Sequence, residues 1–240
     1  MQVSEILRRS EQGVTQPFVC RGRDGNVYFA KGRNLTRKGL VAEYVSAELA
    51  ELFGVPTLEH TILNVPRELV VVSSEWRLKD LGPGPVFGTL AAAHLSEIDI
   101  NTAKNVDQAV RKNVAVFDFW IGNGDRSLTE FGGNPNLFID LSDGSLVVID
   151  HNLAFDYEMS LVRQLELHVF RDDLRLAAGS ASERSLYAGK MATCLQDWPR
   201  IVASIPDEWY YLDDEMTEPA ILDLARMKTW LERLSMNEWN

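Results

Sequence analysis

FDFWIGNGDR occupies residues 117–126, NPNLFI follows at 134–139, and VVIDH lies at 147–151. Apolar side chains recur at helical spacing from residue 106 to residue 121, which predicts a helix ending inside the first stretch. Glycines follow at once and carry Asp125 on a short loop, since glycine ends helices and forms turns. Aspartate beside glycine is also common in ordinary turns, so Asp125 alone decides nothing.

A β-hairpin is predicted for the other two stretches. Residues 137–139 and 146–149 are short apolar runs joined through Ser-Asp-Gly, a sequence typical of a tight turn. In a hairpin, the residue before one strand lies close to the residue after its partner. We therefore expect Asn136 and Asp150 to converge, with Asp125 on the loop beside them.

Phosphate transfer needs this combination of side chains. A carboxylate orients the attacking hydroxyl, while an amide and a second carboxylate hold Mg²⁺ against the phosphates of ATP. Magnesium takes oxygen ligands and commonly uses only one or two protein carboxylates. Asp125 suits the first role, and Asn136 with Asp150 suits the second. Asn134 competes with Asn136, which is favoured because it directly adjoins the strand.

The chain is expected to form an α+β fold with a small β-rich lobe and a mainly helical lobe. Short β-prone runs occupy residues 17–20, 26–31, 58–65 and 68–74, with a helix predicted at 40–53. The Gly/Pro-rich stretch at 81–85 is predicted to connect the lobes. These patterns divide the chain into an N-terminal lobe at 1–80 and a C-terminal lobe at 81–240.

The N-terminal lobe supplies a candidate phosphate-binding cation. Lys31 ends a β-prone run, where its charge can neutralise phosphate or merely extend from a strand edge into water. Glu43 and Glu48, on the predicted helix, are alternative partners for its ammonium group. Glu43 is favoured because it shares a helix face with alanines, which permit close approach to a sheet. Residues 12–17 are a weaker candidate for a loop over the phosphates.

The composition of the chain disfavours several classes of partner and indicates where in the cell the protein is expected. The chain has 240 residues and a formal net charge of −11, which disfavours nucleic acid and anionic membranes as partners. Its two cysteines and four histidines show no spacing typical of a disulfide framework or a zinc site. The first residues lack signal-peptide features, and no apolar run approaches the roughly 18 residues of a membrane span. We expect a cytoplasmic protein.

The chain resembles the HipA-like kinases, bacterial relatives of the protein-kinase and lipid-kinase superfamily. The resemblance covers about residues 13–155 and rests on GNGDR, NPNLF, VIDH, YFAK and EYVSAELA. It implies a two-lobed protein-kinase-like fold with ATP in the cleft. By this resemblance Asp125 is the catalytic aspartate, Asn136 and Asp150 hold Mg²⁺, and Lys31, next to Glu43, contacts the phosphates.

The expected function is ATP-dependent phosphate transfer, to serine or threonine of a protein substrate. A small-molecule kinase is one alternative, since a domain of this size and charge can accept either substrate. A pseudokinase that binds nucleotide or a partner protein without turnover is another. The long segment between Asp125 and Asn136 favours the pseudokinase, whereas the complete set of side chains argues against it. The sequence does not identify an antitoxin-like partner.

Overall fold

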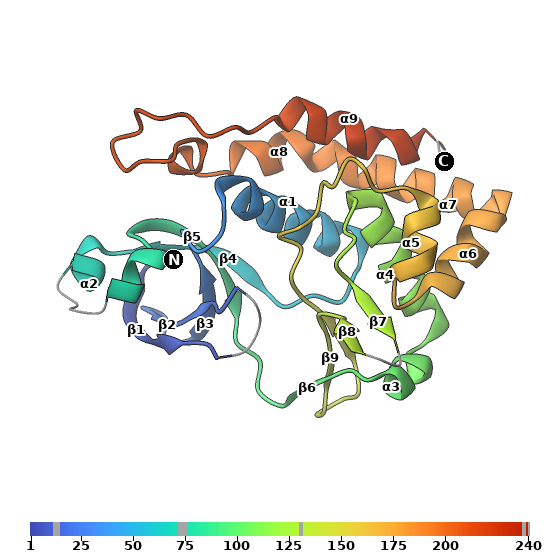
Figure 1. Cartoon of the computed structure of the whole chain (residues 1–240), viewed down its shortest axis with the longest axis horizontal. Helices are drawn as coiled ribbons and strands as arrows, with labels where there is room; N and C mark the ends of the chain where they lie inside the picture. Colours follow the sequence, from blue (N-terminus) through green and yellow to red (C-terminus); the bar gives the residue numbers. More distant parts are fainter. Residues whose placement is uncertain (12–14, 72–75, 130–131, 237–238, 240) are drawn as a thin grey trace. The chain divides into compact units, whose positions relative to one another are not determined.

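The computed structural model describes residues 1–11, 15–71, 76–129, 132–236 and 239 (Figure 1). Backbone contacts divide the chain into two compact units. The first contains Met1–Tyr44, Leu58–Ala93 and Ile205–Leu222, and the second contains Val45–Thr57, His94–Ser204 and Asp223–Asn240. The sheet-based first unit and the mainly helical second unit together give the expected α+β class.

A five-stranded antiparallel sheet forms the first unit. Its strands follow the order β1-β2-β3-β5-β4. They are β1 at Val3–Arg9, β2 at Phe18–Gly22, β3 at Val27–Lys31, β4 at His60–Val65 and β5 at Gly84–Leu90. Alternate residues such as Phe18, Cys20 and Ala30 enter one apolar core with Leu63 and Val86. Removing these side chains from water is the main force that holds the sheet together.

Two segments of the first unit differ from the sequence-based expectation. The predicted strand at 68–74 is wrong over its described part, because Arg67–Val71 forms helix α2 and residues 72–75 lie outside the described residues. A preceding proline and an acidic first turn both favour helix initiation there. Gly84–Leu90 begins inside the predicted connection but is β5, because it pairs with β3 and β4. Proline is tolerated at the start of such a strand.

Helix α1, Arg37–Phe53, follows β3 and contains the helix predicted at 40–53. The short helix η1, Trp76–Asp80, precedes β5, and η3 at Asp207–Tyr210 lies in the C-terminal segment of the first unit. In that segment Trp209 donates a hydrogen bond from Nε1 to the carbonyl oxygen of Pro85, at 2.8 Å. This contact ties the C-terminal segment to the sheet.

Helix α4, Gln108–Ile121, lies at the centre of the second unit. Every residue from Val114 to Ile121 is buried, as expected for a helix enclosed on all sides. Asp107 caps its start by accepting hydrogen bonds from the backbone N–H groups of Ala109 and Val110. Gly122 ends it at φ 68°, a left-handed conformation that glycine adopts without steric cost.

The other helices of the second unit that the structure describes are mostly short (Figure 1). They are α3 at Ile100–Asn105, α5 at Leu161–Leu167, α6 at Arg171–Gly179, α7 at Ala181–Cys194, η2 at Leu195–Asp197, α8 at Trp198–Ala203 and α9 at Leu224–Ser235. Helix α4 packs against α6 and α9, and α7 packs against the same two helices. No helix among the described residues is long and apolar enough to span a bilayer.

Two hairpins lie next to α4 in the sequence. The predicted hairpin is present as β9, Leu137–Asp140, and β10, Leu146–Val148, with Val148 opposite Leu137. Strand β6, Leu95–Glu97, adds to the other edge of β9. A second hairpin, β7 at Ser127–Thr129 and β8 at Gly132–Asn134, lies in the long segment between Asp125 and Asn136. Strands this short show too few alternations to be recognised in the sequence.

Candidate active site

The first unit contains a buried lysine–glutamate pair. Lys31 ends β3, and its Nζ lies 3.1 Å from Oε2 of Glu43 on α1. Only 9% and 5% of the two side chains is exposed. The competing Glu48 instead accepts a hydrogen bond from Arg200, at 2.9 Å. The structure therefore brings Lys31 to Glu43. The weaker candidate loop at 12–17 includes residues 12–14, which lie outside the described part of the chain.

The second unit brings two asparagines to Asp125. The loop that follows α4 carries Asp125, and its carboxylate oxygen Oδ2 accepts hydrogen bonds from both amides. Nδ2 of Asn134 lies 2.7 Å away and Nδ2 of Asn136 lies 3.4 Å away. Both competing asparagines thus contact the same carboxylate, and Asn134 makes the shorter contact.

The β9–β10 hairpin places Asn136 and Asp150 at one end, as its register predicts. The backbone N–H of Ile149 donates to the carbonyl oxygen of Asn136, at 3.1 Å. Asn136 has φ 48° and Asp150 has φ 62°, both in the left-handed region. Asparagine and aspartate enter this region more readily than other residues with a side chain. Such conformations cluster at functional sites, where the surrounding structure holds them.

The charges around Asp125 favour a cation. Burial raises the pKa of Asp125, and the negative charge of Asp150 raises it further. The hydrogen bonds from Asn134 and Asn136 and the charge of Arg126 act in the opposite direction. A cation beside the two carboxylates would relieve their repulsion and favour their ionised forms.

The available donor atoms fit magnesium. A carboxylate only accepts hydrogen bonds, so each asparagine turns its NH₂ group toward Asp125 and keeps its carbonyl oxygen for another partner. Together with Asp150 these form an all-oxygen set, which a hard cation such as Mg²⁺ prefers. The described residues contain no group of three or more His, Cys, Asp or Glu side chains suited to a metal. A metal here would therefore take few protein carboxylates, as Mg²⁺ commonly does.

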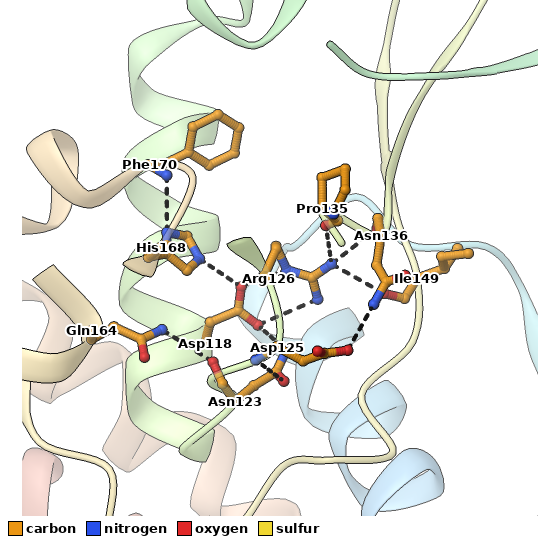
Figure 2. Close-up of polar contacts among 10 residues, drawn as sticks. All are labelled: Asp118, Asn123, Asp125, Arg126, Pro135, Asn136, Ile149, Gln164, His168 and Phe170. Carbon is orange, nitrogen blue, oxygen red and sulfur yellow. Dashed lines mark hydrogen bonds and ion pairs between the residues drawn. The ribbon is translucent and has the colours of Figure 1, made fainter. Parts of the chain in front are cut away.

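Arg126 is a site residue that the sequence analysis missed. Its guanidinium has no exposed surface, and Nε lies 2.6 Å from Oδ2 of Asp118 (Figure 2). Nη1 donates to the backbone carbonyl groups of Pro135, Asn136 and Ile149, at 2.9 to 3.1 Å. One side chain thus ties the loop of Asp125 to the residues that precede β9 and follow β10.

Asp118 anchors this arrangement from inside α4. Asn123 donates to its Oδ1 at 2.8 Å, and Nε2 of His168 lies 2.9 Å from its Oδ2. The backbone N–H of Phe170 donates to Nδ1 of His168, so Nε2 carries the proton that His168 shares with Asp118. Burial acts to raise the pKa of Asp118, but the charge of Arg126 and the hydrogen bond from His168 hold it well below its usual range.

The sequence does contain one signal of this network. Asp118 lies four residues after Val114 and three before Ile121, on the apolar face of the predicted helix. A charged side chain at such a position must have a buried partner, because an isolated charge is costly away from water. The spacing does not identify that partner, since Arg126 reaches Asp118 only after the chain turns at Gly122.

The chain is similar to known kinases in sequence pattern and in fold. A sequence model of the HipA-like kinase family matches residues 3–240, whereas none of the curated protein sequences compared matches the chain. The crystal structure of the Golgi casein kinase with Mn/ADP bound has a TM-score of 0.54 at 12% identity, covering 99% of this chain and 72% of that chain.

Two further solved structures resemble the chain. A second structure of the Golgi casein kinase has a TM-score of 0.52 at 11% identity, covering 99% of this chain and 70% of that chain. The Helicobacter pylori proinflammatory kinase CtkA has a TM-score of 0.49 at 11% identity, covering 98% of this chain and 91% of that chain. The similarity to the two Golgi casein kinase structures confirms the expected fold class.

Proposed function

The chain belongs to the HipA-like kinase family, and we propose that it transfers the γ-phosphate of ATP, with Mg²⁺, to a serine or threonine of a protein. The observation that carries the proposal is the convergence of two asparagine amides on Asp125. The neighbouring hairpin end delivers Asp150, whose charge acts on the same carboxylate. The Mn/ADP bound in the similar Golgi casein kinase structure is in keeping with a nucleotide and a divalent cation.

Each side chain has a proposed role that follows from its chemistry. Asp125 accepts a hydrogen bond from the acceptor hydroxyl and orients its oxygen toward the γ-phosphorus. Lys31 contacts phosphate oxygens, and Glu43 fixes the position of its ammonium group. Asn136 and Asp150 hold the cation through their side-chain oxygens. When bound, Mg²⁺ neutralises negative charge on the phosphates.

The pseudokinase alternative loses part of its support. The sequence favours it through the long segment between Asp125 and Asn136, whose extra residues are able to disturb the metal geometry. The described part of that segment instead forms the β7–β8 hairpin, and Asn136 remains within 3.4 Å of Asp125. A small-molecule kinase remains the alternative that differs only in its acceptor.

The acceptor class is tested with radiolabelled ATP. Purified protein, Mg²⁺ and [γ-³²P]ATP are incubated in parallel with the protein fraction of a cell lysate and with its metabolite pool. We expect label on serine or threonine of protein. Label in a metabolite alone would assign a small-molecule kinase. ATP binding without transfer to protein, metabolite or water would assign a pseudokinase.

Asp125→Asn is the matched control for that assay. It keeps the size of the side chain but removes its charge, so transfer should fall by about 10² to 10⁴. Binding of Mg·ATP should stay within a few-fold of wild type, because Asp125 acts on the acceptor. Near wild-type transfer by this variant would refute the assignment of Asp125.

A further inference from the structure

The β7–β8 hairpin returns the chain to Asp125 by a path that depends on glycine. Its register pairs Ser127 with Asn134 and Leu128 with Gly133. A Cβ atom at Gly133 would collide with the backbone carbonyl of Ser127, so the two strands approach closely only because residue 133 has no side chain. Asn134 therefore ends the hairpin directly beside the loop of Asp125.

Contacts on its outer side hold the hairpin in place. Ser127 forms an antiparallel bridge with His168, and the backbone N–H of Val169 donates to the carbonyl oxygen of Arg126, at 3.1 Å. Leu128 is buried, with 8% of its surface exposed. These contacts link the hairpin to the buried network around Asp118. They therefore restrain the backbone position of Asn134.

The two carboxylate oxygens of Asp125 differ in the hydrogen bonds that they accept. Asn134 and Asn136 both donate to Oδ2, and the contact from Asn134 is the shorter one. Among the residues that the structure describes, none donates a hydrogen bond to Oδ1. A carboxylate fixed through one oxygen can present the other to an incoming hydroxyl in a single orientation.

We propose that Asn134 is a positioning residue that orients Asp125 through Oδ2, so that Oδ1 meets the acceptor hydroxyl. The β7–β8 hairpin serves to hold Asn134 in this place. Asn136 is thereby left to hold the cation through its carbonyl oxygen. The assignment rests on the proposed function, since it concerns the orientation of the proposed catalytic aspartate.

The test compares Asn134→Asp and Asn134→Ala with wild type. Asn134→Asp keeps the shape of the side chain but replaces the NH₂ donor with an oxygen whose charge also repels Asp125, whereas Asn134→Ala removes the donor without adding charge. We expect kcat to fall about 10- to 10²-fold in both variants, the range of one hydrogen bond to a charged group. KM for ATP should stay within about threefold, and the Mg²⁺-dependent rise in Tm with ATP should persist. Asn101→Ala, at an exposed position on α3, is the matched control and should behave as wild type.

Each other outcome identifies a different error. Wild-type kcat in Asn134→Asp and Asn134→Ala would overturn this assignment and leave the proposed function intact. Loss of the Mg²⁺-dependent rise in Asn134→Ala would make Asn134 a metal ligand instead. Unfolding of both variants would make its role structural. A wild-type protein that transfers no phosphate would overturn the proposed function and this assignment together.

Discussion

Each unit of the molecule contains a buried ion pair, and the two pairs differ in how completely they are enclosed. Lys31 and Glu43, in the first unit, keep 9% and 5% of their side-chain surface exposed. Arg126 and Asp118, in the second unit, keep none. A charge with no exposed surface cannot meet a ligand, so its role is to hold the fold. A charge at a strand end that keeps some exposed surface can still act on a ligand.

The surroundings of the enclosed pair make it harder to replace. Arg126 also donates to three backbone carbonyl groups, and Asp118 also contacts Asn123 and His168. Replacing a simple buried ion pair by neutral groups of similar volume is often neutral for stability. Removing a donor from several buried acceptors is not, because each unsatisfied group carries a desolvation cost. Substitutions in the two ion pairs should therefore differ in how much they lower the free energy of unfolding.

The largest effect on stability is expected for Arg126→Met. It removes the positive charge that balances buried Asp118 and takes the guanidinium donor from the carbonyl groups of Pro135 and Ile149, which should lower the free energy of unfolding by about 3–5 kcal/mol. Adding Asp118→Asn should not restore stability, because the carbonyl groups still lack a donor. Urea denaturation measures both variants. Arg175→Met, which removes an exposed ion pair with Asp172, is the control and should cost less than about 1 kcal/mol. Wild-type stability in the variant that combines Arg126→Met with Asp118→Asn would contradict this expectation, because the enclosed pair would then be as replaceable as a simple ion pair.

A smaller effect is expected from acid. The pKa of Asp118 is lower in the folded chain than its unfolded value of about 3.9, so its contribution is complete above that value and is lost as pH falls toward the folded pKa. Between pH 7 and pH 3, wild type should lose about 1 kcal/mol from this group alone. Urea denaturation of Asp118→Asn across the same range should lack this loss. Equal pH dependence in the two proteins would show that Asp118 keeps an ordinary pKa.

A comparably small effect is expected at Glu43. Glu43→Gln keeps a side chain of the same size but weakens its hold on Lys31, so ATP turnover should fall by about fivefold, the equivalent of one hydrogen bond of about 1 kcal/mol. Glu48→Gln is the matched control on the same helix, because Glu48 contacts Arg200 instead. Steady-state turnover distinguishes the two. An equal loss in both variants would mean that the helix, and not the contact with Lys31, determines the rate.

Local signals in the sequence were enough to predict the elements around Asp125. A repeated apolar face predicted α4, and two apolar runs around Ser-Asp-Gly predicted the β9–β10 hairpin with Asn136 and Asp150 at one end. Pattern alone left Glu43 and Glu48 as alternatives, because both lie on turns of α1 that can face the sheet. The partner of each glutamate, Lys31 or Arg200, comes from a segment outside α1. The local sequence of the helix does not show which segment packs against which turn.

The features that the sequence missed depend on contacts between distant residues. Gly84–Leu90 contains residues that normally interrupt strands, and it is a strand because β3 and β4 both pair with it. Arg126 holds the site together by donating to backbone carbonyl groups. Every residue has such a group, so the sequence does not show which ones Arg126 contacts. The two strands of β7–β8 are too short for their alternation to be visible.

The most direct test measures turnover and stability together in the double variant Lys31→Met/Glu43→Gln. Both replacements keep approximate volume and remove charge, so the free energy of unfolding should stay within about 1 kcal/mol of wild type. A cation that binds phosphate more strongly as charge shifts in the transition state acts mainly on turnover. ATP turnover should therefore fall by at least about 10²-fold, or roughly 2.7 kcal/mol in barrier height. A stable double variant that transfers phosphate at the wild-type rate would contradict the account, because Lys31 would then have no part in the reaction.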